Sequence, residues 1–355
     1  MVFIYIFIYT YLNKKMIKIN KNIAFHDNGP PKLIAEISCN HCGSKSLFLK
    51  HILKAKQYGA DLIKIQTYEA EDMVVNKNFK IKSGIWKNKN LYNLYKKAQT
   101  PYDWHYDAFK LAKKNNITLF STPFNERSFK FLKKFNPDLY KVSSFEITDL
   151  NLIRLIAQTK KPIIISTGLA SEKNILSAVK VVKKFHGKII LLHCVSGYPT
   201  PLKEANLKKI DVLKKFTKIK YVGFSDHTQG IYASTIASNY GICAIEKHFI
   251  LNKKLNSPDK NFSITPDELK KLKSNILNNI SMNKLNEKKS EKDSIIFRRS
   301  IFAIKEIKKG QIFSRKNINC FRPVIGIGAE NYYKILGKKA KKNIKAYSPI
   351  NKHFF

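Results

Sequence analysis

The chain has 355 residues, with 66 Lys and Arg against 25 Asp and Glu, a formal net charge of +41, and 44% hydrophobic residues. This composition can bury a sizeable core, which excludes disordered, collagen-like and disulfide-scaffold proteins. The length allows roughly two domains of about 100 to 200 residues, or one barrel with an appendage.

The excess of positive charge does not by itself predict a nucleic-acid partner. Nearly all of the basic residues are lysine, whereas arginine is the side chain whose planar fork suits phosphates and base edges. The lysines are also spread along the whole chain, while nucleic-acid binders concentrate charge on one face. We therefore expect no nucleic-acid partner. A non-catalytic protein whose basic surface binds nucleic acid or anionic lipid remains the alternative.

Residues 1–30 are predicted to be an N-terminal extension. The stretch from Met1 to Leu12 is apolar, but it is too short to span a bilayer and lacks the basic region and cleavage site of a signal peptide. We expect Met16 to be the true start, with residues 1–15 a mis-annotated addition, and no membrane partner. Five cysteines, an odd number in a chain of this size, favour the reducing cytoplasm.

Between residues 31 and 280, short apolar runs alternate with amphipathic stretches. Continuous apolar runs are typical of parallel strands that are covered by helices on the outside. Eight such units match the count and size of a (β/α)8 TIM barrel. The strands are predicted at residues 33–37, 62–66, 118–121, 139–142, 163–166, 189–193, 221–224 and 243–246.

After the barrel, one helix, a linker and a second domain are predicted. A helix over 265–280 begins with Thr265 as its N-cap and Pro266 at its first helical position. Residues 281–294 are polar with few apolar positions, as in a linker. Residues 295–355 carry short β-like pieces, at 301–304 and 318–321, among glycines and prolines. They predict a small β-rich domain.

Polar side chains stand at the predicted ends of the barrel strands, where barrel enzymes carry their catalytic groups. Lys64, Lys141, Ser144, Ser166 and Ser225 supply cations and hydroxyl groups, which suit a small substrate with a phosphate and a carboxylate. Burying a lysine inside a strand is costly unless an anion meets it. The sequence therefore predicts an anion site at this end of the barrel.

Two histidines and one glutamate add a second kind of chemistry at the same end. His227 and His248 end the seventh and eighth strands, so two imidazoles are able to share one divalent metal ion and leave positions open for water and substrate. Spacing alone leaves a purely structural role for the histidines equally open. Glu36 ends the first strand, beside the eighth in a closed barrel, where it is placed to handle a proton or orient a water.

Taken together, the strand ends resemble the sialic acid synthase family, whose members condense phosphoenolpyruvate with a sugar. The tail resembles the antifreeze-like (SAF) domain of the same family. The resemblance covers residues 32–350 in the family's order. The matching stretches are AEISCNHCGS from Ala35, GADLIKIQTY from Gly59, LFSTPF from Leu119, YKVSSFEITD from Tyr140, PIIISTGLAS from Pro162, LLHCVSGYPTP from Leu191, GFSDHTQGI from Gly223, EKHFILN from Glu246, RRSIFAIKEIKKGQIF from Arg298 and FRPVIGI from Phe321.

Within that family, the segment from Trp86 to His105 is more similar to pseudaminic acid synthases than to N-acetylneuraminate synthases. This implies condensation of phosphoenolpyruvate with 2,4-diacetamido-2,4,6-trideoxy-altrose, a hexose, to give pseudaminic acid and phosphate by C–C bond formation and C–O cleavage. An N-acetylneuraminate or legionaminate synthase with another acceptor sugar is the nearer alternative. A TIM-barrel aldolase that forms a Schiff base on Lys64 or Lys141 is the more distant one.

The resemblance also implies a role for each matching residue. Glu36, His227 and His248 are implied to be catalytic, with a divalent metal, Mn or Mg, on the two histidines. Two residues depart from the family pattern: Ser196 stands where many members have Asn, and Lys260 where many have His. The implied phosphoenolpyruvate-binding residues are Lys64, Thr122, Lys141, Ser144, Ser166, Ser196 and Ser225, and the implied sugar-binding residues are Gln66, Glu146, Tyr198, Asp259 and Arg322, the last reaching across a domain-swapped homodimer.

Overall fold

The structure, a computed structural model, describes residues 16–27, 29–282 and 289–355. The chain divides into two units, Met1–Asn283 and Lys284–Phe355, and the division falls inside the predicted linker of residues 281–294. The predicted addition at residues 1–15 lies outside the described residues. Each unit is described by itself below.

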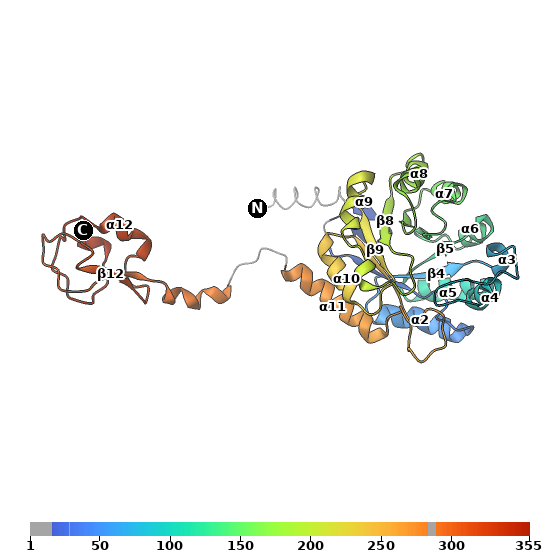
Figure 1. Ribbon diagram of the computed structural model, residues 1–355, viewed down its shortest axis with the longest axis horizontal. Helices are drawn as coiled ribbons and strands as arrows, with labels where there is room; N and C mark the ends of the chain where they lie inside the picture. Colours follow the sequence, from blue (N-terminus) through green and yellow to red (C-terminus); the bar gives the residue numbers. More distant parts are fainter. Residues whose placement is uncertain (1–15, 28, 283–288) are drawn as a thin grey trace. The chain divides into compact units, whose positions relative to one another are not determined.

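Eight parallel strands of the first unit close into a barrel, with β10 paired to both β9 and β3 (Figure 1). The predicted (β/α)8 barrel is therefore confirmed, and every predicted strand is present with no end shifted by more than two residues. The strands are β3 Lys32–Glu36, β4 Leu62–Thr67, β5 Thr118–Pro123, β6 Tyr140–Val142, β7 Ile163–Ser166, β8 Ile189–Cys194, β9 Val222–Asp226 and β10 Ala244–His248.

Both faces of these strands are buried, which explains why most of their residues are apolar. Leu33 and Ile63 point outward into the layer between strands and helices, whereas Ile34 and Leu62 point into the barrel. Because side chains alternate along a strand, every second residue after an inward one also faces inward. The inward series on β4 thus runs from Leu62 to Lys64 and Gln66. The barrel interior is apolar at the amino ends of the strands and polar at their carboxyl ends.

Helices cover the outside of the barrel and begin at good capping residues. The side chain of Ser44 caps α2, Asn125 and Ser171 form capping boxes at α6 and α8, and Thr265 and Glu268 bond each other's backbone at the start of α11. The predicted start of α11 is therefore confirmed. The helices are α2 Lys45–Gln57, α5 Tyr102–Lys114, α6 Glu126–Lys133, α7 Leu150–Ala157, α8 Glu172–Lys183, α9 Lys209–Thr217, α10 Tyr232–Ala237 and α11 Pro266–Met282.

A hairpin closes the amino end of the barrel. It consists of β1 Met16–Lys18 and β2 Ala24–His26, which pair antiparallel. Ile17 and Phe25 are buried in one cluster with inward residues of the barrel strands. Residues Ile17 and Phe25 thus pack against the barrel strands.

A long connection, from the end of β4 at Thr67 to the start of α5 at Tyr102, lies at the carboxyl ends of the barrel strands. It carries two helices that the sequence analysis did not predict, α3 Ala70–Met73 and α4 Leu91–Ala98. Asn90 caps α4 by accepting a hydrogen bond from the backbone of Asn93. Backbone bonds between Ile81 and residues 88 and 89 tie the preceding loop to itself. This connection forms one wall of the cavity described below.

The second unit is small and contains more turns than regular strands. Its antiparallel pair, β11 Ser300–Ala303 and β12 Ile318–Phe321, lies where strands were predicted. Isolated bridges and the short helix α12 Tyr332–Ile335 complete it. Its core includes Ile301, Phe313 and Ile344.

Among the described helices, none combines the length and the apolar composition that crossing a membrane requires.

Candidate active site

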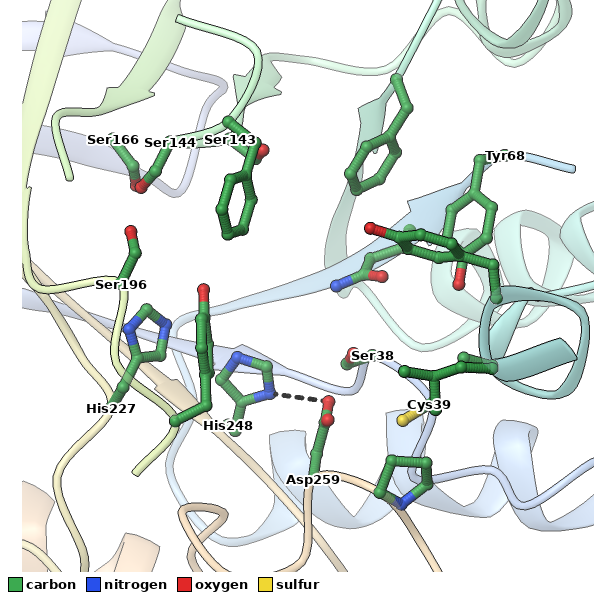
Figure 2. Close-up of a pocket in the computed structure, with 18 of the residues that line it drawn as sticks. Ser38, Cys39, Tyr68, Ser143, Ser144, Ser166, Ser196, His227, His248 and Asp259 are labelled. Carbon is green, nitrogen blue, oxygen red and sulfur yellow. Dashed lines mark ion pairs between the residues drawn. The ribbon is translucent and has the colours of Figure 1, made fainter. Parts of the chain in front are cut away.

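A cavity of about 320 Å³ opens at the carboxyl ends of the barrel strands (Figure 2). Polar residues that end the strands line one side, and the connection between β4 and α5 lines the other. Most of the predicted site residues lie together here. Those that line the cavity are Lys64, Gln66, Lys141, Ser144, Ser166, Ser196, Tyr198, Ser225, His227, His248 and Asp259.

Two buried lysines lie beneath the polar side of the cavity, each close to a glutamate. Nζ of Lys64 forms an ion pair with Glu36 and lies 3.8 Å from Oε1 of Glu246. Nζ of Lys141 lies 3.9 Å from the same Glu246 oxygen and donates a hydrogen bond of 2.7 Å to Ser166. Two ammonium groups thus face two carboxylates, and the cluster is close to neutral before any substrate is bound.

The environment sets the protonation of this cluster. Burial by itself would lower the pKa of Lys64, but the charges of Glu246 and Glu36 outweigh it and raise that pKa. For Lys141 burial dominates, and its pKa is lowered. Burial would raise the pKa of Glu246, yet Lys141 and Lys64 hold it below its ordinary value. Glu246 is therefore ionised at neutral pH.

Glu36 is not among the residues that line the cavity, and its catalytic role stays a prediction. Its carboxylate accepts a hydrogen bond of 2.7 Å from the backbone N–H of Ser38 and pairs with Lys64. The cavity lining instead includes Glu246, whose Oε2 is buried and has no hydrogen-bond partner among the described residues. Glu246, to which no role was assigned from the sequence, is thus a carboxylate in the cavity lining.

Hydroxyl groups surround the lysines on the same side. Ser225 donates to Glu246 Oε1 at 3.1 Å, and Thr122 accepts a bond of 3.3 Å from Lys64. Oγ of Ser196 is buried without a partner among the described residues, and Figure 2 shows it facing Ser144 and Ser166. A buried hydroxyl left unpaired is costly, so a bound group is expected to meet it.

A glycine is needed beside these serines. A Cβ added to Gly168 would lie 2.4 Å from Oγ of Ser196 and 3.0 Å from Oγ of Ser144. Any side chain at this position would therefore displace the hydroxyls. The close approach of these side chains to the backbone therefore requires a glycine at position 168.

His227 and His248 lie side by side, with ring centroids 5.5 Å apart. Nδ1 of His227 faces the carbonyl of Val195 at 2.9 Å, and Nδ1 of His248 faces Oδ2 of Asp259 at 3.3 Å. The contact of His227 places its proton on Nδ1 and leaves Nε2 as an acceptor, whereas Nδ1 of His248 makes no hydrogen bond to a described residue. Burial and the neighbouring His248 lower the pKa of His227 to about 3, so this ring is neutral.

This pair fits a divalent metal ion with an incomplete set of protein ligands. Among the described residues, neither Nε2 has a hydrogen-bond partner, and no group of three or more His, Cys, Asp or Glu side chains is placed to hold a metal. A bound ion would therefore take its remaining ligands from water or substrate oxygen, as catalytic metal sites do.

The predicted sugar-binding residues are only partly brought together. Gln66, Tyr198 and Asp259 line the cavity. Glu146 does not line it, because its carboxylate accepts a hydrogen bond from Ser143 at the edge. Arg322 belongs to the second unit, so the structure of the first unit does not include it.

The fold and the site define a (β/α)8 barrel protein with a cavity, lined by lysine, serine and histidine side chains, at the carboxyl ends of its strands. Comparison with known proteins is more specific. Residues 51–288 match the NeuB family, and residues 298–355 match the SAF domain. The chain belongs to the NeuB family.

Individual relatives cover most of the chain. A pseudaminic acid synthase of Campylobacter jejuni is 42% identical over 88% of this chain and 93% of its own length. An N,N'-diacetyllegionaminic acid synthase of the same species is 39% identical over 88% and 96%. The crystal structure of an N-acetylneuraminic acid synthetase from Leptospira borgpetersenii, in complex with citrate, is 32% identical, with a TM-score of 0.71 over 79% of this chain and 95% of that one. The resemblance inferred from the motifs is confirmed.

Proposed function

We propose that this chain condenses phosphoenolpyruvate with a 2,4-diacetamido-2,4,6-trideoxyhexose to give pseudaminic acid and phosphate. One observation carries the proposal: the buried ammonium groups of Lys64 and Lys141 lie under one side of a single cavity, among serine hydroxyls. This arrangement suits a small molecule that carries both a phosphate and a carboxylate. The pseudaminic acid synthase relatives, at up to 42% identity, support the choice of acceptor.

Phosphoenolpyruvate would bind with its anionic groups toward the two lysines. Ser144, Ser166 and Ser196 would donate hydrogen bonds to its phosphate oxygens. The cluster is close to neutral when empty, so a trianionic substrate adds uncompensated negative charge. A divalent ion on His227 and His248, Mn or Mg, would supply the missing positive charge and polarise the sugar carbonyl.

The reaction makes one C–C bond and breaks one C–O bond. The C3 carbon of phosphoenolpyruvate attacks the carbonyl carbon of the open-chain sugar, and the carbonyl oxygen takes up a proton and becomes a hydroxyl. Water adds to C2, which carries the phosphate. The C2–O bond then breaks, phosphate leaves with the bonding electrons, and the new hydroxyl loses its proton as the keto group forms.

Glu246 is the group we assign to proton transfer in this sequence. It is ionised, and its Oε2 has no hydrogen-bond partner in the described part of the chain. It is therefore suited to accept the proton of the attacking water and return it to the leaving phosphate. Lys64 and Lys141 would stabilise the anionic oxygens throughout.

The finer assignments follow from the same proposal. The SAF unit carries Arg322, which would reach the acceptor sugar in the barrel of a second copy, in a domain-swapped homodimer. The substrates are small metabolites and all cysteines in the described residues are free thiols, so we place the enzyme in the cytoplasm.

The deciding experiment is phosphate release from phosphoenolpyruvate, measured with a panel of acceptor sugars, with and without Mn²⁺. Turnover with an altro-configured diacetamido sugar supports the proposal. Turnover only with the manno epimer would reassign the chain as a legionaminate synthase, in line with the second relative. Borohydride trapping of substrate on Lys64 or Lys141 would instead indicate a Schiff-base aldolase.

A further inference from the structure

The cavity has two ends of different chemistry. Figure 2 shows Ser144, Ser166, Ser196 and His227 at one end and Tyr68 at the other. The second end is formed by the connection between β4 and α5 and by the residue after β5. Its lining residues are Tyr68, Ile81, Trp86, Leu91, Leu94, Tyr95, Ala98 and Phe124, which we call the apolar wall.

The apolar wall is held in place by ring packing and by the cap of α4. Tyr68, only 2% exposed, packs edge-on against Tyr95 and Phe124, with ring centroids 5.6 and 5.1 Å apart. Trp86 lies 5.8 Å from Tyr198, which itself packs on His227. The wall is therefore a formed surface that continues to the metal-binding end.

Three polar groups at this end of the cavity have no hydrogen-bond partner among the described residues. The side-chain amide of Gln66, next to the wall on β4, and the hydroxyls of Tyr68 and Tyr95 make no hydrogen bond to any described residue, although all three residues line the cavity. Burial raises the pKa of Tyr68, so its hydroxyl remains a neutral donor. A ligand group that carries an amide beside a methyl would suit this surface. The amide would form hydrogen bonds with the unpaired polar groups, and the methyl would pack against the rings.

The wall contains no charged side chain in the described residues that form it. Phosphoenolpyruvate needs the lysines, so it occupies the opposite end, and the reacting carbonyl of the acceptor must lie beside it. The far part of the sugar, with the substituents on C4 and C6, then extends toward the wall. A phosphate on C6 would find no cation there, and a hydroxymethyl group would place a hydroxyl where a methyl packs on the rings.

We propose that the apolar wall selects the acceptor, with Tyr68, Tyr95 and Phe124 contacting a C4 acetamido group and a C6 methyl group. The inference rests on the proposed function and names the residues that set its specificity. One extra or missing small group in an apolar pocket changes kcat/KM by about 10- to 200-fold. We expect the diacetamido-trideoxy acceptor to exceed a 2-acetamido-2-deoxyhexose at least tenfold, and the 6-phosphate of the latter to be inactive.

Two variants of one helix provide a matched pair. Tyr95→Phe removes a hydroxyl from the wall, whereas Tyr92→Phe removes one from the outer side of α4, where it bonds Glu71. We expect Tyr95→Phe to lower kcat/KM for the diacetamido acceptor about threefold to tenfold and Tyr92→Phe to leave it unchanged. Phe124→Ala should lower it by a further large factor, and both wall variants should leave KM for phosphoenolpyruvate within about twofold.

Measurements of activity and of binding distinguish failure of the proposed function from failure of the proposed role of the apolar wall. If no acceptor on the panel releases phosphate, the proposed function fails, and saturation-transfer NMR still tests the wall by whether the acetyl methyl protons receive magnetisation from the protein and lose it in Phe124→Ala. If phosphate is released but the hydroxylated acceptor performs equally well, the wall does not select. Loss of selectivity in Phe124→Ala supports the inference, and unchanged selectivity in that variant overturns it.

Discussion

Asp226 and Lys247 form an ion pair of 3.0 Å in which neither side chain is exposed. They are partners across β9 and β10, and each directly precedes one of the paired histidines. Lys247 also donates to the carbonyl of Thr228, while the backbone N–H of Thr228 and the hydroxyl of Ser234 donate to Asp226. This network links the two strand ends that carry His227 and His248.

Replacing Lys247 with Met should be strongly destabilising, because Asp226 would remain as a buried and unpaired charge. Removing one partner of a buried pair typically costs about 3–5 kcal/mol. Urea unfolding at pH 7 measures the effect. Lys45→Met, which breaks an exposed pair with Asp107, is the control and should leave the midpoint unchanged. The double variant Asp226→Asn/Lys247→Met should recover part of the loss. Equal stability of Lys247→Met and the parent would contradict the account.

Glu246→Gln should lower kcat by about a hundredfold or more, because the amide cannot accept a proton from water. Binding of phosphoenolpyruvate should not weaken, since one negative charge beside Lys64 and Lys141 is removed. Phosphate release and calorimetric titration measure the two effects. Glu204→Gln, on an exposed turn, is the control. A kcat within twofold of the parent would exclude Glu246 from proton transfer.

His248→Ala should abolish metal-dependent turnover while unfolding remains cooperative. The variant keeps only one of the two imidazoles, so Mn²⁺ binding, followed by electron paramagnetic resonance, should weaken by orders of magnitude. His353→Ala, exposed in the second unit, serves as the control. Unchanged Mn²⁺ affinity in His248→Ala would remove the metal site from this position.

Glu146 should make stability depend on pH. Burial raises its pKa to about 7 from an ordinary 4.5. The folded protein therefore binds this proton more tightly than the unfolded chain does. The contribution is fully present below about pH 4.5 and is lost as pH rises through about 7. Urea unfolding at pH 5 and pH 8 should show a smaller difference for Glu146→Gln than for the parent; identical differences would contradict the assignment.

Arg322→Ala should raise KM for the acceptor sugar far more than KM for phosphoenolpyruvate, because its charge is assigned to the acceptor. If the units are exchanged between copies, mixing Arg322→Ala with Lys141→Ala should restore activity, since the mixed dimer has one intact site. Neither variant alone would show this gain. A mixture no more active than its parts would contradict domain swapping.

Most of the barrel could be predicted because its strands are buried on both faces. A run such as Leu62 to Gln66 is apolar except at Lys64 and Gln66, and these exceptions are the inward positions at the carboxyl end. The hairpin of β1 and β2 could not be predicted, since its strands are three residues long and their burial depends on the barrel floor. Helix α4 was missed for a similar reason, because none of its residues is buried.

The sequence could not predict which of two carboxylates, Glu36 or Glu246, lines the cavity. Both are inward carboxylates at strand ends, and both lie near Lys64. What separates them is a contact: the backbone N–H of Ser38 and the ammonium of Lys64 occupy Glu36. Only the folded arrangement shows that Glu246, and not Glu36, lines the cavity.

The wall that faces the acceptor is built largely from a loop between β4 and α5, while the groups assigned to bond making and breaking sit on the barrel strands. The residues proposed to select the acceptor and the residues proposed to carry out the reaction therefore lie largely in separate segments of the chain. Under the proposed assignment, exchange of the stretch from about Val75 to Ala98 would replace Tyr95 and the aliphatic residues of the wall, and would leave Tyr68, Phe124 and the barrel strands in place.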